Sequence, residues 1–213
     1  MSLRTVRLVI ATTNLGKLRE IGAILREAPI ELCRPIDCLG YGPTIVEDGD
    51  TFESNAKLKA QAVAQLTGEF TIADDSGLEV DALLGAPGVR SARYAGENAS
   101  DAENNQALLL ALGKLGLTQS TARFRCAMAL VAPDGALVAE RSGVCEGVVQ
   151  SVQRGSHGFG YDPLFVVSKL GKRTMAELEQ DEKNQVSHRG RALTAMLPVL
   201  LGLPKWSGAV AVK

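Results

Sequence analysis

Two long runs of residues that favour β-strands follow each other in this chain, with only three residues between them. The runs are Ala122 to Ala132 and Ala136 to Val149, and the residues between them are Pro133, Asp134 and Gly135. Proline, aspartate and glycine favour tight turns, and so short a connection makes the two strands antiparallel neighbours. The sequence therefore predicts a long β-hairpin, which could belong to a second lobe.

The N-terminal part of the chain has the pattern of a strand, a tight loop and a helix. Val6 to Ala11 is apolar enough for a buried strand, and Asn14 can cap a helix from about Leu15 to Glu27. Pro29 ends this helix, and Ile30 to Arg34 is predicted as a second strand.

The remaining elements follow from periodicity and from glycine and proline. Loops are predicted at 35–49, 85–96 and 155–162, helices at 51–66, 100–115, 176–182 and 187–201, and a short strand at 163–167. There is no internal repeat or low-complexity linker, so we expect a single domain that covers residues 1–213.

An apolar strand that runs directly into two aspartates points most clearly to chemistry. Residues 70–78 have the sequence FTIADDSGL, and because side chains alternate along a strand, Asp74 and Asp75 cannot both point into one cleft. Gly77 would let the chain turn away where ligands bind in α/β sheets. We expect a metal site here, with one aspartate at the reacting centre. A solvated turn or a helix cap is the alternative.

Composition and charge narrow the classes of partner. The chain has 213 residues, of which 46% are hydrophobic, so it can bury a substantial core. Lys and Arg number 23 against 24 acidic residues, and aromatic residues make up 4%, so polymeric nucleic acid is not expected as a partner. The N-terminal apolar stretch is too short for a signal core and no run could span a bilayer, so we expect a cytoplasmic protein without a membrane partner.

Polar side chains at the ends of four separated segments suggest one cleft. The segments are Thr12-Thr13-Asn14 with Lys17, Glu47, Asp74-Asp75-Ser76, and Phe159 to Asp162 with His188-Arg189. A helix N-terminus with free N–H groups and a lysine one turn later suits phosphate, although any capped helix with an exposed lysine looks similar. The P-loop and G-x-G-x-x-G fingerprints are absent, which disfavours a P-loop ATPase or a dinucleotide enzyme.

Six motifs occur in order between about Leu8 and Leu193. They are ATTNLGKLREI, EDGDTFESNAKLKA, IADDSGLEVDAL, PGVRSARYAG, GFGYDPLF and EKNQVSHRGRAL. With these motifs the chain resembles the Ham1/inosine triphosphate pyrophosphatase family, bacterial dITP/XTP pyrophosphatases that remove noncanonical purine nucleotides. The resemblance implies an α/β fold with an elongated, mixed and twisted central sheet flanked by helices. It also implies two lobes with an active-site cleft between them, and a homodimer.

The resemblance also implies residues for the phosphate end of the site. Glu47 and Asp75 would bind Mg²⁺, which prefers carboxylate and phosphate oxygens, and Asp75 would activate the attacking water. Arg93 and Lys59 could instead be solvated surface residues. Ser76 would also contact the substrate. The residues expected to hold the triphosphate or to line the anionic site are Thr12, Thr13, Asn14, Leu15, Gly16, Lys17, Lys59, Arg93 and Lys183.

At the base end, the resemblance implies that Phe159 stacks on the purine and that Gly160, Tyr161 and Asp162 line its edge. His188 and Arg189 would reach the oxygen at position six. Because arginine only donates hydrogen bonds, Arg189 would oppose the 6-amino group of adenine, whereas the 6-oxo group of guanine is not excluded in this way. Alternatively, Phe159 and Tyr161 are core aromatics that pin a loop, and His188 caps a helix.

These expectations combine into Mg²⁺-dependent hydrolysis of ITP, dITP and XTP to the nucleoside monophosphate and pyrophosphate, which cleanses the nucleotide pool. One rival is a Maf-like pyrophosphatase acting on modified pyrimidine triphosphates or dTTP, and another is a nucleotide-binding module without turnover. Thr13 departs from the pattern because many relatives have glycine there. A β-branched residue would be strained if that turn needs a positive φ.

Overall fold

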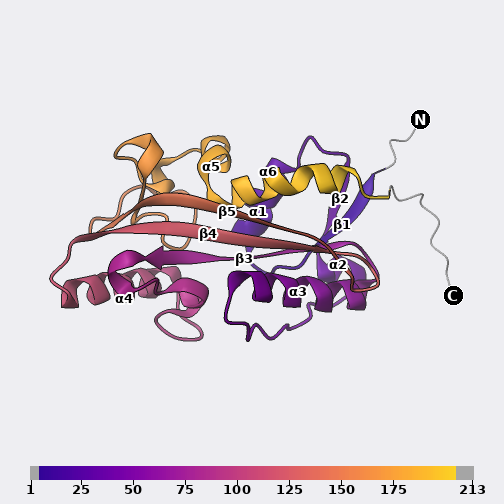
Figure 1. The fold of residues 1–213 in the computed structure, drawn as a ribbon, viewed down its shortest axis with the longest axis horizontal. Coiled ribbons are helices and arrows are strands. Elements are labelled where there is room, and N and C mark those ends of the chain that lie inside the picture. Colours follow the sequence, from indigo (N-terminus) through magenta and orange to yellow (C-terminus); the bar gives the residue numbers. More distant parts are fainter. Residues whose placement is uncertain (1–4, 205–213) are drawn as a thin grey trace.

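The computed structural model describes residues 5–204, and at its centre lies one six-stranded sheet in the order β2-β1-β3-β4-β5-β6 (Figure 1). β1 runs parallel to both β2 and β3, and the remaining pairs are antiparallel. The elongated mixed sheet implied by the resemblance is therefore confirmed. The strands are β1 Val6–Ile10, β2 Ile30–Cys33, β3 Thr71–Val80, β4 Gln119–Val131, β5 Leu137–Gln150 and β6 Phe165–Val167.

Helices cover the sheet, with α1 and α6 on one face and α3 on the other (Figure 1). α4 packs near the end of the long strands that lies away from β1. Because side chains alternate along each strand, both faces of the sheet carry apolar side chains. Leu8 and Ile72 pack under α1 and α6, and Val9 and Ala73 pack under α3. The helices are α1 Leu15–Ile24, α2 Pro35–Leu39, α3 Phe52–Thr67, α4 Asp101–Lys114, α5 Gln180–Val186 and α6 His188–Leu201. No helix within residues 5–204 has the length and apolarity needed to cross a membrane.

The predicted hairpin is confirmed and makes the molecule long. The turn closes when the Gly135 N–H donates to the Ala132 carbonyl at 2.9 Å, and Gly135 adopts a φ of 86°. β3 pairs with β4 from Thr71 to Val80, whereas β1 pairs with β3 only at Thr71 and Ile72. Beyond Ile72, β3 therefore has an edge that β1 does not cover.

The prediction that the chain turns away at Gly77 is wrong, because β3 continues to Val80. β4 offers a partner for every residue of this strand, so nothing ends it at the aspartates. Gly77 is needed for a different reason. A Cβ atom there would lie 2.4 Å from both the Gly88 carbonyl oxygen and the Ser91 hydroxyl.

Three other boundaries differ from the prediction. The loop expected at 35–49 begins with α2, because Pro35 occupies the first helical turn and Gly40 ends the helix in the left-handed region. The segment 85–96 contains a 3₁₀ helix, Gly88–Arg93. The helix expected at 176–182 begins at Gln180, because the Ala176 backbone instead bonds to His157 and Asp162.

Candidate active site

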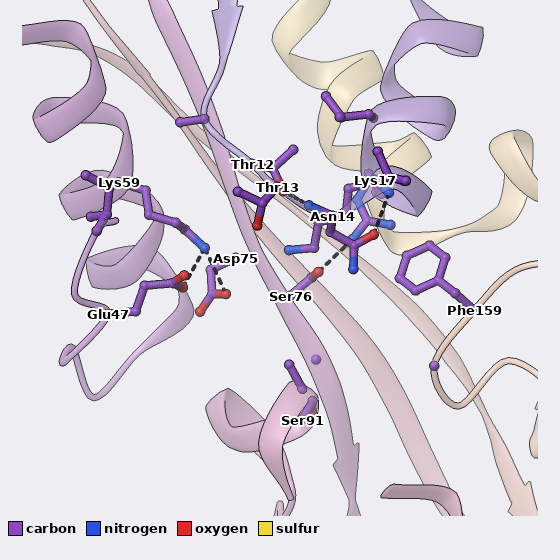
Figure 2. Close-up of a pocket in the computed structure, with 18 of the residues that line it drawn as sticks. Thr12, Thr13, Asn14, Lys17, Glu47, Lys59, Asp75, Ser76, Ser91 and Phe159 are labelled. Atoms are coloured by element: carbon purple, nitrogen blue, oxygen red, sulfur yellow. Dashed lines mark hydrogen bonds and ion pairs between the residues drawn. The ribbon is translucent and has the colours of Figure 1, made fainter. Parts of the chain in front are cut away.

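A pocket of about 750 Å³ lies beside β3, beyond the end of β1 (Figure 2). The loop after β1 and the start of α1 form one side of it, and the loop that carries Glu47 forms another, together with α3. The loop around Phe159, the middle of α5 and the start of α6 form a third side, and the 3₁₀ helix Gly88–Arg93 and the start of α4 also line the pocket. This volume is within the range of small-molecule sites in proteins.

The structure brings nearly all of the predicted site residues together in this pocket, although their individual roles remain predictions. Gly16 alone is not part of the lining. A Cβ atom at Gly16 would lie 2.5 Å from the ring of Phe159, so glycine lets that ring pack against the first turn of α1. The predicted residues that line the pocket are Thr12, Thr13, Asn14, Leu15, Lys17, Glu47, Lys59, Asp75, Ser76, Arg93, Phe159, Gly160, Tyr161, Asp162, Lys183, His188 and Arg189.

The two aspartates of β3 face opposite sides of the sheet, as the strand period predicts. Asp75 meets Lys59 and Asn55 of α3, whereas Asp74 meets Lys17 of α1 and Arg189 of α6. Each aspartate therefore belongs to a different charged cluster.

On the α3 side, two carboxylates share one ammonium group. Lys59 Nζ lies 2.7 Å from Glu47 Oε2 and 3.3 Å from Asp75 Oδ1, and both ion pairs are drawn in Figure 2. Burial raises the pKa of Asp75, and Lys59 and Lys17 offset this only in part. Burial would lower the pKa of Lys59, but Asp75, Asp74 and Glu47 raise it, so the lysine is charged.

The same pair of carboxylates fits a hard divalent cation. Their oxygens converge on a single positive charge, which is the arrangement that a metal between a loop and a strand requires. Residues 5–204 contain no group of three or more His, Cys, Asp or Glu side chains that could hold a metal. A site with only two protein carboxylates suits Mg²⁺, which keeps several waters and takes further oxygens from substrate phosphates.

On the other face of β3, buried charges form a continuous chain from α1 to the Phe159 loop. Arg189 donates to Asp74 at 3.0 Å, to the Ser76 hydroxyl at 2.7 Å and, through Nη1, to Glu20. Lys183 then joins Glu20 at 2.7 Å to Asp162 at 2.5 Å.

The charges in this chain are balanced by their neighbours. Burial would raise the pKa of Asp74, but Lys17 and Arg189 hold it well below its ordinary value. Burial would likewise raise the pKa of Glu20, and Arg189 and Lys183 lower it. Both carboxylates are therefore ionised, and each depends on two cations.

Asp162 and two residues of α4 hold the Phe159 loop through hydrogen bonds. Asp162 accepts from the Phe159 N–H at 3.0 Å, while Asp101 and Asn105 bind the N–H and the carbonyl of Gly160 at 2.7 and 3.0 Å. The ring of Phe159 has two cations nearby, with Lys183 Nζ 5.1 Å and Arg189 Cζ 5.6 Å from its centroid. These contacts hold an aromatic face at the end of the pocket.

Tyr161 serves the core as well as the pocket. Its hydroxyl donates to the Ser91 carbonyl at 2.8 Å, and its ring belongs to the apolar cluster around Phe165. The alternative that this tyrosine is a core aromatic that pins a loop is therefore supported.

His188 is a buried, uncharged imidazole at the start of α6. Its ring stacks on Phe124 with centroids 4.8 Å apart, and its Nδ1 has no hydrogen-bond partner although the residue lines the pocket. Burial, with help from Arg189 and Lys183, lowers the pKa of His188 well below its ordinary value. Ser187, not His188, caps the helix.

We expect the stability of the protein to fall as the pH drops below about 6.5, because of His188. Below this pH, His188 takes up a proton in the unfolded chain but stays neutral in the folded chain. The free energy of unfolding therefore falls by up to about 1.4 kcal/mol per pH unit. Urea unfolding at several pH values between about 7.5 and 5.5 checks this. His188→Gln should flatten the dependence, and His157→Gln, at the more exposed histidine, should retain it. Equal slopes in His188→Gln and wild type would contradict the assignment.

The loop after β1 differs in two ways from expectation. The N–H groups of Gly16 and Lys17 are not free, because the Asn14 side chain accepts from both at 2.8 and 3.1 Å. Thr13 causes no strain, since Leu84 is the only residue other than glycine with a positive φ within residues 5–204. The backbone of this turn therefore does not require glycine.

Sequence reasoning missed several polar residues that the structure places around the pocket. Glu20 follows Lys17 by three residues and lies on the buried side of α1, and Asn55 precedes Lys59 by four residues on α3. The spacing of each pair puts it on one helix face, which is the only available signal. Asp101 and Asn105 had no signal, because their contact with Gly160 joins segments far apart in the sequence.

Comparison with known proteins identifies the family of this chain. The sequence profile of the Ham1 family matches residues 8–199. A protein of Geobacter sulfurreducens named dITP/XTP pyrophosphatase is 54% identical over 202 residues, which is 95% of this chain and 98% of the relative. A Syntrophobacter fumaroxidans protein of the same name is 50% identical over 199 residues, 93% of this chain and 84% of the relative.

Solved structures show the same fold. A HAM1 protein from Coxiella burnetii superposes with a TM-score of 0.83 at 42% identity, over 93% of this chain and 100% of the other. The Ham1 protein of Staphylococcus aureus gives a TM-score of 0.78 at 39% identity, over 92% and 98% of the two chains.

Proposed function

The chain belongs to the Ham1 family, and from this membership and its pocket we propose that it hydrolyses the noncanonical purine nucleoside triphosphates ITP, dITP and XTP. The products are the nucleoside monophosphate and pyrophosphate, and the reaction depends on Mg²⁺. The relatives named dITP/XTP pyrophosphatase support the substrate class. One observation carries the chemistry, namely that Glu47 and Asp75 converge on the Lys59 ammonium inside the pocket.

Each group at the phosphate end has a task in this reaction. Glu47 and Asp75 would hold the Mg²⁺, which, when bound, offsets charge on the phosphate oxygens and makes a bound water more acidic. Asp75 accepts the proton of the water that attacks the α-phosphorus, and the bond from that phosphorus to the bridging oxygen of pyrophosphate breaks. Lys59 and Lys17 supply positive charge for the triphosphate, next to the N-terminus of α1.

The base end supports a 6-oxopurine. Phe159 offers a face for stacking, and neutral His188 and the guanidinium of Arg189 lie on the same side of β3 as Asp74 and Ser76. A group that only donates, such as Arg189, pairs with a 6-oxo group and leaves the 6-amino group of adenine without an acceptor. We propose that this mismatch excludes ATP. Guanine has a 6-oxo group, so Arg189 does not exclude GTP in the same way.

A panel of triphosphates tests the proposal by product analysis with Mg²⁺ and with a chelator. We expect ITP, dITP and XTP to yield pyrophosphate and the monophosphate, and we expect kcat/KM for ATP to be about 10⁴-fold lower than for ITP. The chelator should abolish turnover. Preferred turnover of dTTP or modified pyrimidine triphosphates would favour the Maf-like alternative instead. Saturable binding of ITP without products would favour a binding module.

The setting of the enzyme is proposed from the same family membership. We expect residues 1–213 to form a single domain with two lobes, and two such subunits to form a homodimer. We expect the enzyme to act on free nucleotides in the cytoplasm. Size-exclusion chromatography with light scattering measures the oligomeric state directly.

A further inference from the structure

Asn55, in the first turn of α3, uses a single buried amide to bind both Asp75 and the backbone of the loop that carries Glu47. The side-chain nitrogen donates to Asp75 Oδ2 at 3.1 Å, and the side-chain oxygen accepts from the Gly49 N–H at 2.8 Å. Gly49 follows Glu47 by only two residues. One side chain therefore ties the strand that carries Asp75 to the loop that carries Glu47.

The amide can be used in only one orientation. A carboxylate accepts and a backbone N–H donates, so the nitrogen must face Asp75 and the oxygen must face Gly49. Asn55 is only 1% exposed, so water does not replace either contact. With Oδ2 of Asp75 held by Asn55, Oδ1 faces Lys59, the group that also binds Glu47.

The loop approaches α3 closely at this point. A Cβ atom on Gly49 would lie 2.3 Å from the Ser54 hydroxyl and 2.7 Å from the Asn55 oxygen. The loop can therefore reach the amide only because residue 49 is a glycine. Glu47 takes its position from this contact and from its ion pair with Lys59.

We propose that Asn55 is a positioning residue that sets the geometry of the Glu47 and Asp75 carboxylates for a divalent cation. The inference rests on the proposed function, because it concerns the same metal. Groups that orient metal ligands in this way typically change metal affinity by ~10 to 100-fold when they are removed. A residue that only filled space in α3 would affect stability and leave metal affinity as it is.

The test measures Mn²⁺ binding by electron paramagnetic resonance, in the presence of the α,β-imido analogue of ITP, which resists cleavage. We expect Asn55→Ala to raise the Mn²⁺ dissociation constant by ~10 to 100-fold, and to raise the Mg²⁺ concentration for half-maximal ITP turnover to a similar extent. Asn55→Leu, which is nearly the same size, should also weaken Mn²⁺ binding, because leucine can neither donate to Asp75 nor accept from the Gly49 N–H.

The control is Thr174→Ala. Thr174 is also a buried polar residue, its hydroxyl donates to the Arg154 carbonyl at 2.8 Å, and it neither lines the pocket nor contacts Glu47 or Asp75. Its Mn²⁺ affinity should equal that of the wild type. Unchanged Mn²⁺ affinity in a folded Asn55→Ala or Asn55→Leu protein would overturn the inference. If the wild type itself neither binds Mn²⁺ with the analogue nor hydrolyses ITP, the proposed function fails and this role fails with it.

Discussion

Replacing Asp75 with asparagine is expected to lower kcat for ITP by at least ~10²-fold, while substrate binding stays measurable. Asparagine has nearly the same shape as aspartate and can still accept the hydrogen bond that Asn55 donates at 3.1 Å. It cannot take a proton from water, and it is a weaker ligand for Mg²⁺ because it lacks the negative charge. The loss therefore falls on the chemical step more than on the contacts that hold the nucleotide.

Steady-state kinetics with ITP at saturating Mg²⁺ separate kcat from KM for this variant. Asp81→Asn is a suitable control, because Asp81 follows the same strand and binds Thr121 and Arg123 on the surface, outside the pocket. Its kcat should match the wild type. A near wild-type kcat in Asp75→Asn would remove this carboxylate from the mechanism.

Replacing Arg189 with alanine is expected to lower the free energy of unfolding by about 3 kcal/mol, because it leaves two buried carboxylates without their shared partner. Asp74 and Glu20 both bind this guanidinium, and the three side chains are nearly inaccessible to water. Lys17 and Lys183 would remain, so each carboxylate keeps one cation. For this reason the expected loss is at the lower end of what the removal of one buried partner costs.

Urea unfolding followed by circular dichroism measures this change. Arg173→Ala provides the control, because Arg173 forms an ion pair with Glu182 near the surface, where solvent weakens the interaction. The control should lose much less stability than Arg189→Ala. Equal losses in the two variants would mean that the buried chain of charges contributes no more than a surface pair does.

Local patterns in the sequence predicted most of the architecture correctly. Pro133, Asp134 and Gly135 predicted the hairpin, and the alternation of side chains placed Asp74 and Asp75 on opposite faces of β3. These predictions succeed because turn formation and strand periodicity depend on neighbouring residues alone. The family resemblance supplied the mixed sheet, and the strand order confirms it.

Predictions that depended on the rest of the molecule were less successful. Gly77 looked like the end of a strand, yet β4 continues the pairing to Val80 and the glycine instead admits the Gly88 carbonyl. Residues 176–182 have a helical pattern, but the Ala176 backbone is used to hold the Phe159 loop. In each case a partner distant in sequence decided the outcome.

The sequence by itself determined which residues are available for the site, since nearly all the residues that the family resemblance named lie in the lining of the pocket. Only the tertiary structure decided how those side chains are held. The helix spacing of Glu20 and Asn55 could not show that they are used, because burying a charge or an amide is favourable only where the fold supplies its partners. Those partners, Arg189 for Glu20 and Asp75 for Asn55, come from other elements and meet them only when α1, α3 and α6 pack against β3.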